Sequence, residues 1–148
     1  MILVQHILED ARRRLAVLTR EASVCDAADI LANANTPLVV VCDSEGIAVG
    51  VVSRTDIVKV FSRARGDAVN TNVEAIMTKP VHSCHVDQTV QSVWAAMGAR
   101  SLRCTPVLDD CRRPQGVVHA RDIARALLDE VTDEEVLLRD YVLGIGYQ

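Results

Sequence analysis

Two stretches of the chain share one pattern of apolar and polar positions, residues 50–57 and residues 116–123. Each has a glycine, an apolar pair, three mostly polar residues and an aspartate, followed by an apolar run with helical spacing. The apolar pair predicts a short buried strand and the following run predicts a helix. The copies lie 66 residues apart, which indicates an internal duplication of this strand, turn and helix.

The first copy contains further elements before this motif. Ser23 is in position to cap a helix with apolar residues at 24, 27, 28, 30 and 31. The nearly continuous β-branched run at 37–42 is typical of a strand covered on both faces. A turn at 43–46 and a second apolar run at 47–52 then predict a hairpin that leads into the motif.

The second copy repeats these elements in the same order. Residues 81–83 match the apolar run at 15–17, and Thr89 takes the place of Ser23. We predict that Trp94 and Met97 lie on the inner face of the helix after Thr89 and belong to the core. The offset between the copies changes from 66 to 69 around the Pro-containing strand and then returns, so the length changes fall in loops.

The repeats divide the chain into five segments. We expect an N-terminal helical segment at 1–14, a first repeat at 15–62, a polar connector at 63–76, a second repeat at 77–130, and a C-terminal helix and tail at 131–148. The last segment continues an apolar stripe beside strongly acidic positions, but the run from Gly144 to Tyr147 should not continue a helix. This helix either mediates dimerisation or covers its own module.

Composition adds limits on partners and location. Hydrophobic residues make up 49% of the 148 residues and aromatic residues 3%, which predicts an aliphatic globular core. A net charge of −4 with interspersed signs offers no basic stripe for DNA or RNA. The five cysteines lack C-x-x-C spacing, and no apolar run suits a signal peptide or a membrane span. We expect a soluble cytoplasmic protein with reduced thiols and without nucleic-acid or membrane partners.

Each motif places a polar side chain three residues before a carboxylate, Ser53 before Asp56 and His119 before Asp122. A carboxylate can accept hydrogen bonds from both hydroxyls of a vicinal diol. A hydroxyl, the free N–H groups of the helix that follows and a nearby arginine can hold an anion. An aspartate at this position can also serve only as a helix cap. The pattern is therefore compatible with a nucleotide site and with a purely structural turn.

Signals for catalysis or metal binding are weak. The chain has no G-x-S-x-G, no P-loop and no isolated acid and base pair, so we expect no enzymatic activity. His82, Cys84 and His85, with Cys104 and His119, would suggest zinc. Alternation along a strand would however direct His82 and Cys84 to one face and His85 to the other. We expect no metal and no required cofactor.

Taken together, the two motifs, the Pro-containing strand in each copy and the Ile76, Met77, Thr78 junction resemble a tandem pair of CBS domains, the cystathionine-β-synthase-type module. The similarity covers residues 2–130. It implies an α+β fold in which two β-α-β-β-α repeats pack about a pseudo-two-fold axis. It also implies two clefts that bind adenine nucleotides such as AMP, ADP or ATP, and sometimes NAD or S-adenosylmethionine, in energy or metabolite sensing.

The resemblance further implies a set of ligand contacts. The motif aspartate would take the ribose hydroxyls, the residue three positions before it would face the phosphate, and backbone near the Pro-containing strand of the other copy would read the adenine. One cleft would combine Ser53 and Asp56 with Val81, His82, Ser83, Leu102, Arg103 and Cys104. The other would combine His119 and Asp122 with Val17, Asn33, Ala34 and Asn35. Arg54, Arg103 and Arg121 would face either phosphate or solvent and ion pairs, with Arg103 the first choice for phosphate.

The two clefts should differ. Val17 stands where the second copy has Ser83, and His119 takes the Ser/Thr position of the second motif, so the Asp56 cleft is closer to the family pattern. We expect a stand-alone regulatory module that binds an adenine nucleotide in the Asp56 cleft, forms a homodimer and signals its occupancy to a protein partner. The alternative is a structural or dimerisation module that has kept the fold without the ligand.

Overall fold

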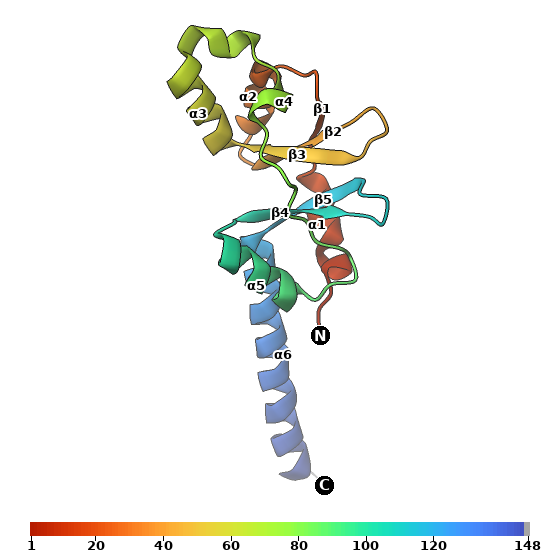
Figure 1. Cartoon of the computed structure of the whole chain (residues 1–148). Coiled ribbons are helices and arrows are strands. Elements are labelled where there is room, and N and C mark those ends of the chain that lie inside the picture. Colours follow the sequence, from red (N-terminus) through yellow and green to blue (C-terminus); the bar gives the residue numbers. More distant parts are fainter. Residues whose placement is uncertain (147–148) are drawn as a thin grey trace.

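The computed structural model of the chain, which describes residues 1–146, has two small α/β lobes stacked on each other and one long helix that extends away from them (Figure 1). The elements in chain order are η1 Val4–Ile7, α1 Leu8–Arg13, β1 Val17–Thr19, α2 Val24–Leu31, β2 Leu38–Cys42, β3 Ala48–Ser53, α3 Arg54–Ala64, η2 Arg65–Asn70, α4 Val73–Ile76, α5 Val90–Arg100, β4 Cys104–Leu108, β5 Pro114–His119 and α6 Ala120–Gly146.

The first lobe is built on a three-stranded sheet in the order β1-β2-β3. β1 runs parallel to β2, and β2 pairs with β3 in an antiparallel hairpin. Every residue of β2 is buried, which confirms the prediction of a strand covered on both faces. Ser23 caps α2 by accepting a hydrogen bond from the Asp26 backbone N–H at 3.0 Å, as the sequence predicted.

The second lobe repeats this plan with a shorter sheet. β4 and β5 form the antiparallel hairpin, and Cys84 bridges to Val107 in parallel, in the position that β1 takes in the first lobe. Thr89 caps α5 by accepting from the Ser92 backbone N–H at 3.1 Å. The two repeated units, each with helices and a short sheet, confirm the predicted α+β pair.

The two lobes exchange their N-terminal segments. The Val4 backbone N–H donates to the Gln88 carbonyl at 2.9 Å, and Ala11 of α1 belongs to the core of the second lobe. In return, the Val51 backbone N–H donates to the Thr78 carbonyl at 3.0 Å, and Val73 belongs to the core of the first lobe. Each lobe is completed by a segment that precedes the other repeat, so the lobes form one folded unit.

The segment predicted as a polar connector, residues 63–76, is more structured than expected. It holds η2 and α4, and within it Ala68 and Val73 are completely buried. Ala68 is followed by the exposed Val69, and Val73 lies between Asn72 and Glu74, so the apolar positions here show no regular helical or strand spacing. Ala68 and Val73 fix the path of the chain between the repeats because burial of apolar surface stabilises this crossing.

The helix α5 corrects one prediction. Met97 is 2% exposed and lies in the core as expected, but Trp94 is 45% exposed. The buried stripe consists of Val90, Val93 and Met97, spaced by three and four residues, and Trp94 lies one position beyond this narrow stripe. The assignment of Trp94 to the core was therefore wrong.

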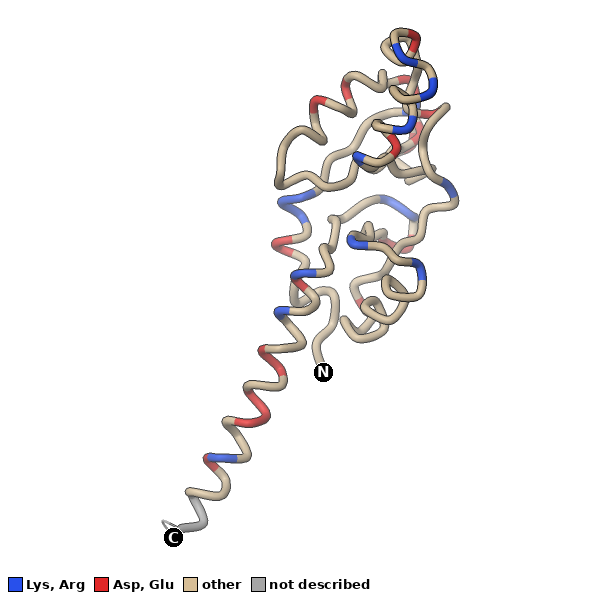
Figure 2. Tube along the Cα trace, turned by 90° about the vertical axis from the view of Figure 1, so that its left-hand side faces the viewer, with Lys and Arg blue, Asp and Glu red and all other residues tan. Residues whose placement is uncertain are grey.

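The helix α6 is longer than the sequence suggested. The helix of the second motif and the apolar, acidic segment beyond it form one uninterrupted helix through Gly146, so the expected helix end near Gly144 was wrong; Tyr147 lies outside the described residues. Positions 131–143 are all exposed, and Figure 2 shows acidic residues along this part of the helix. Among the described helices, none combines the length and the apolar character that crossing a membrane would require.

Candidate functional site between the lobes

The first motif forms a capping box at the start of α3. The Ser53 side chain accepts from the Asp56 backbone N–H at 3.3 Å, and the Ser53 backbone N–H donates to Asp56 Oδ2 at 2.9 Å. The Thr78 hydroxyl also donates to the Asp56 carboxylate, at 3.3 Å. The carboxylate is thus held by the helix that it caps and by the segment that crosses from the other lobe.

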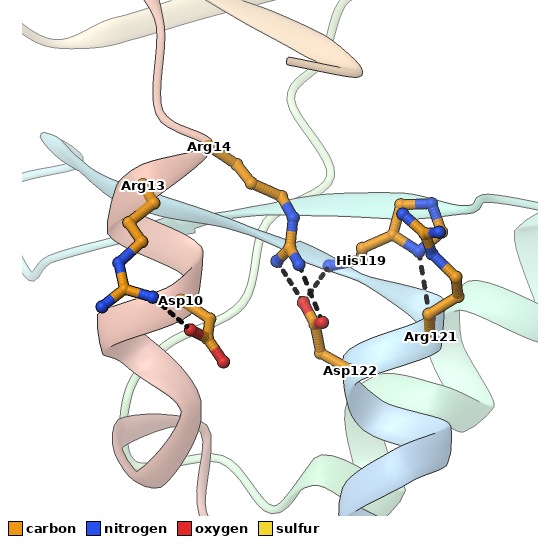
Figure 3. Close-up of polar contacts among 6 residues, drawn as sticks. All are labelled: Asp10, Arg13, Arg14, His119, Arg121 and Asp122. Atoms are coloured by element: carbon orange, nitrogen blue, oxygen red, sulfur yellow. Dashed lines mark hydrogen bonds and ion pairs between the residues drawn. The ribbon is translucent and has the colours of Figure 1, made fainter. Parts of the chain in front are cut away.

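The second motif has a different partner, because His119 replaces the capping hydroxyl. The His119 backbone N–H still donates to Asp122 Oδ2 at 3.3 Å, but the carboxylate is clamped by Arg14 (Figure 3). Arg14 Nη2 donates to Asp122 Oδ1 at 2.8 Å, and Arg14 Nη1 donates to Oδ2. The side chains are only 19% and 12% exposed, so this bidentate pair is largely shielded from water.

A cavity of about 670 Å³ lies where the lobes meet, and we call it the central cavity. The first lobe and the second lobe both line it. Its lining residues are Pro37, Leu38, Ser53, Arg54, Thr55, Ser101, Leu102, Arg103, Cys104 and His119. A volume of this size can hold a nucleotide.

A second cavity of about 410 Å³ shares Pro37, Arg54, Arg103 and His119 with the central cavity, so the two lie side by side. Its remaining lining residues are Arg14, Ala34, Asn35 and Arg121. We call it the arginine cavity, because the side chains of four arginines line it. Together these cavities offer hydroxyl, guanidinium and apolar groups from both repeats.

Arg54 shapes the wall between the cavities. Its Nε donates to the Leu31 carbonyl at 2.9 Å, and its Nη2 donates to the Asn33 carbonyl at 3.0 Å and to the Thr36 carbonyl at 3.3 Å. These bonds tie the first residue of α3 to the loop that follows α2, because carbonyls at a helix C-terminus lack partners within the helix. Arg54 therefore serves as a scaffold of the cleft while its charge remains at the cavity wall.

The residues predicted for the Asp56 cleft do not all meet. Ser53, Leu102, Arg103 and Cys104 line the central cavity. Val81, His82 and Ser83 line, with Leu102, a separate cavity of about 290 Å³ beside α5, where His82 Nε2 lies 3.2 Å from Arg100 Nη1. Asp56 lines neither; it borders another cavity of about 390 Å³ with Lys59 and Arg63.

The residues predicted for the other cleft are also divided. His119, Ala34 and Asn35 line the arginine cavity, and Asp122 reaches it through its ion pair with Arg14. Arg121, which was not assigned to either cleft, lines the same cavity. Val17 lies on β1 with 44% of its surface exposed and is absent from the linings of the described cavities.

Sequence reasoning missed Arg14. The residue follows α1, lies 108 residues from Asp122 and occupies no position of the repeated motif. Its only sequence signal is its place in the Arg12, Arg13, Arg14 run at the end of an amphipathic helix, which is equally typical of a solvated helix terminus.

Three ionisable side chains near the cavities, His119, Cys104 and Cys84, have pKa values that favour their neutral forms. Burial, followed by the positive charges of Arg121 and Arg14, lowers the pKa of His119. The His119 Nδ1 accepts from the Arg121 backbone N–H at 3.0 Å, which also favours the neutral ring. Burial raises the pKa of the Cys104 thiol to about 11 and that of the Cys84 thiol to about 12, so both remain protonated at neutral pH.

These features describe a site suited to binding. Within residues 1–146, no group of three or more His, Cys, Asp or Glu side chains is arranged to hold a metal ion. The available chemistry is recognition of an anion by guanidinium groups, of a polar ligand by Ser53, and of an apolar ring by Leu38, Pro37 and Leu102.

Comparison with known proteins places this cleft in a family context. The model of the CBS domain family matches residues 4–63 and 73–129. An uncharacterized 17.7 kDa protein of Acidianus ambivalens is 31% identical over 136 residues, which are 92% of this chain and 81% of that protein. L-aspartate semialdehyde sulfurtransferase of Methanocaldococcus jannaschii is 33% identical over 103 residues, 70% of this chain but only 19% of the enzyme, so the chain spans a small part of that relative.

A solved structure shows the same arrangement of lobes. The CBS domain pair of protein MJ0100, in complex with 5'-methylthioadenosine and S-adenosyl-L-methionine, superimposes with a TM-score of 0.74 at 28% sequence identity, covering 88% of this chain and 98% of that one. The match of the family model to both repeats, and the shared fold, lead to one conclusion: the chain belongs to the CBS domain family, as a tandem pair of CBS domains.

Proposed function

We propose that this chain is a regulatory CBS module that binds an adenine nucleotide in the central cavity and signals its occupancy to a partner protein. The observation that carries the proposal is the convergence of Ser53 from one repeat with Arg103 and His119 from the other on one cavity of about 670 Å³. A related CBS pair, that of protein MJ0100, binds two adenosine derivatives. A nucleotide is a chemical match for the hydroxyl, guanidinium and apolar groups present here.

The mechanism is a shift of population. A ligand that contacts both lobes favours the arrangement in which the lobes are held together, and it stabilises the folded module by about 2.7 kcal/mol at a hundredfold excess over Kd. The module acts by binding without turnover, and the protonated thiols of Cys84 and Cys104 support this reading because a nucleophilic cysteine requires the thiolate.

The geometry favours a capping role for Asp56 over contact with the ribose. Its carboxylate is engaged by Ser53 and Thr78 and borders a different cavity from the one that Ser53 lines. Replacement of Asp56 by Asn should therefore lower nucleotide affinity less than replacement of Arg103 by Ala.

The experiment is a thermal-shift series on the purified chain with AMP, ADP, ATP, NAD and S-adenosylmethionine, together with chromatography of any small molecule that is released on denaturation. We expect a rise in melting temperature with at least one adenine nucleotide at millimolar concentration. No shift with any of them, and no released nucleotide, would refute the proposal.

One observation favours a second candidate function, a structural module without a ligand. Both motif carboxylates are already engaged within the protein, Asp56 by its capping box and Asp122 by Arg14. That function predicts a melting temperature that is indifferent to every nucleotide in the series, so the same experiment separates the two.

The homodimer belongs to this proposal as well. The exposed part of α6 carries seven large apolar side chains, Val131, Val136, Leu137, Leu138, Tyr141, Val142 and Leu143, each at least 45% exposed. These side chains are left exposed in a single copy, and a second copy of α6 would bury them.

A further inference from the structure

Four arginine side chains meet at the arginine cavity although they come from distant parts of the chain. Arg14 follows α1, Arg54 begins α3, Arg103 precedes β4, and Arg121 lies in the first turn of α6. The Ala120 backbone N–H donates to the Arg103 carbonyl at 2.7 Å, which holds the last two of these segments together. The fold thus gathers positive charge from both lobes at one place.

Little negative charge opposes these arginines. Arg14 is paired with Asp122. Arg54 donates only to backbone carbonyls, so its charge has no carboxylate partner. In the part of the chain that the structure describes, Arg103 and Arg121 form no ion pair. Of the four guanidinium charges, one is compensated by a carboxylate and three are not.

The pKa of the neighbouring His119 is affected by the same positive charges. After burial, the charges of Arg121, Arg14 and Arg103 lower the pKa of His119, and the charge of Asp122 in α6 acts in the opposite direction. Like charges disfavour an added proton. An anion in this cavity would remove that penalty, so His119 is positioned to become a further donor when the cavity is filled.

We propose that the arginine cavity binds the phosphate chain of a nucleoside di- or triphosphate, so that this module selects a polyphosphate ligand over a nucleoside monophosphate or a cationic adenosine derivative. The inference rests on the proposed nucleotide function and assigns its ligand class. Guanidinium groups bind phosphate oxygens through paired hydrogen bonds, and several phosphates are needed to use three uncompensated arginines. The positive field disfavours the sulfonium of S-adenosylmethionine, which protein MJ0100 binds.

The test is calorimetric titration of the full chain with ATP, ADP, AMP and S-adenosylmethionine in metal-free buffer, with inorganic tripolyphosphate as a probe that lacks the nucleoside. The variants are Arg103→Ala and Arg121→Ala. The matched control is Arg12→Ala, which removes an exposed arginine that is not among the residues lining the cavity. The wild type should bind ATP at least about tenfold more tightly than AMP.

Both cavity variants should weaken ATP about tenfold, weaken AMP less, and weaken tripolyphosphate, while the control leaves every affinity unchanged. Equal affinity for ATP and AMP, or an equal loss for both nucleotides in the variants, would overturn the polyphosphate assignment while leaving nucleotide binding intact. Tripolyphosphate binding without any nucleotide binding would support the cavity but refute the proposed function. Absence of binding by all probes would overturn both.

Discussion

Arg14 and Asp122 connect the N-terminal segment to the second motif, and this single contact decides how the second cleft differs from the first. In the first motif the carboxylate of Asp56 is satisfied by neighbours in its own capping box and by Thr78. In the second, His119 has no hydroxyl to offer, and an arginine 108 residues away supplies the donors. The aspartate of the first motif is therefore held by its capping box and by a residue 22 positions away, whereas that of the second is held by a residue 108 positions away.

Loss of this ion pair should be costly. Asp122→Asn keeps a hydrogen-bond acceptor but leaves Arg14 charged and 81% buried beside a neutral group, so we expect a loss of about 1–3 kcal/mol in the free energy of unfolding. Urea unfolding measures it. Asp10→Asn, which removes the exposed partner of Arg13, is the control and should cost less than about 0.5 kcal/mol. An equal loss of unfolding free energy in the two variants would show that the buried ion pair stabilises the fold no more than the exposed one.

His119 predicts a pH dependence of stability. Its pKa is lower in the folded protein than the usual value of 6.5, so between these two values the unfolded chain binds more protons and stability rises with pH. The contribution is present above pH 6.5 and is lost as the pH falls through the folded pKa. His119→Asn, which retains an acceptor for the Arg121 N–H, should flatten this part of the profile of unfolding free energy against pH. A variant profile that parallels the wild type below pH 6.5 would contradict the assignment.

At the scale of elements, the motif glycines explain how the lobes interlock. A Cβ on Gly116 of β5 would lie 2.8 Å from the backbone carbon of Ala11 in α1, and a backbone atom cannot give way without a shift of the helix. A Cβ on Gly50 of β3 would meet only the flexible Met77 side chain, with Cγ at 2.6 Å. Both glycines allow a segment from outside the repeat to pack against the hairpin, but they differ in how much substitution they tolerate.

We predict how the substitutions of these glycines rank in their effect on the free energy of unfolding. Gly116→Ala should cost about 1–3 kcal/mol because it forces α1 away from β5, and Gly50→Ala should cost less because Met77 can change rotamer. Gly98→Ala in α5 is the matched control, since nothing lies within 4 Å of its added Cβ, and it should stabilise by about 0.5–1 kcal/mol. Thermal unfolding of the three variants gives the order, and a Gly116→Ala protein as stable as the wild type would contradict the close packing of α1.

The parts of the fold that were predicted correctly from the sequence are those set by residues close together in the chain. The duplicated motif, the buried β2 strand and the caps at Ser23 and Thr89 depend on neighbours within a few residues, so periodicity and capping chemistry reveal them. The Arg14–Asp122 pair and the packing of Ala11 on Gly116 join residues that only the tertiary fold brings together. Trp94 was misassigned because a large apolar side chain beside a narrow buried stripe looks like core in sequence.

The candidate site shows the same division. Ser53, Leu102, Arg103 and Cys104 were expected in one cleft and do line one cavity. Asp56 was expected with them by position in the motif, but its carboxylate turns toward Ser53 and Thr78 and borders another cavity. The direction of the Asp56 side chain depends on Thr78 as well as on Ser53, and Thr78 lies 22 residues away outside the motif, so motif spacing could not predict it.

At the scale of the whole molecule, we expect the exposed part of α6 to mediate the formation of a homodimer. Two copies can bury the apolar stripe that contains Leu138 and Val142, while Asp133 and Asp140 lie on the opposite side of the helix. Sedimentation should show a dimer for the wild type. The double variant Leu138→Gln, Val142→Gln should shift it to the monomer, and the matched double variant Asp133→Gln, Asp140→Gln should remain dimeric. A monomeric wild type at tens of micromolar would contradict dimerisation through α6.

The central claim is that an adenine nucleotide binds between the two repeats, and photoaffinity labelling with 8-azidoadenosine triphosphate, followed by peptide mapping, tests both the ligand and the place. We predict labelled peptides that contain lining residues from both lobes, within 37–55 and within 101–104, and loss of the label in the presence of excess ATP. Absence of ATP-sensitive label, or label confined to the exposed part of α6 or to the cavity beside Asp56, would contradict the account.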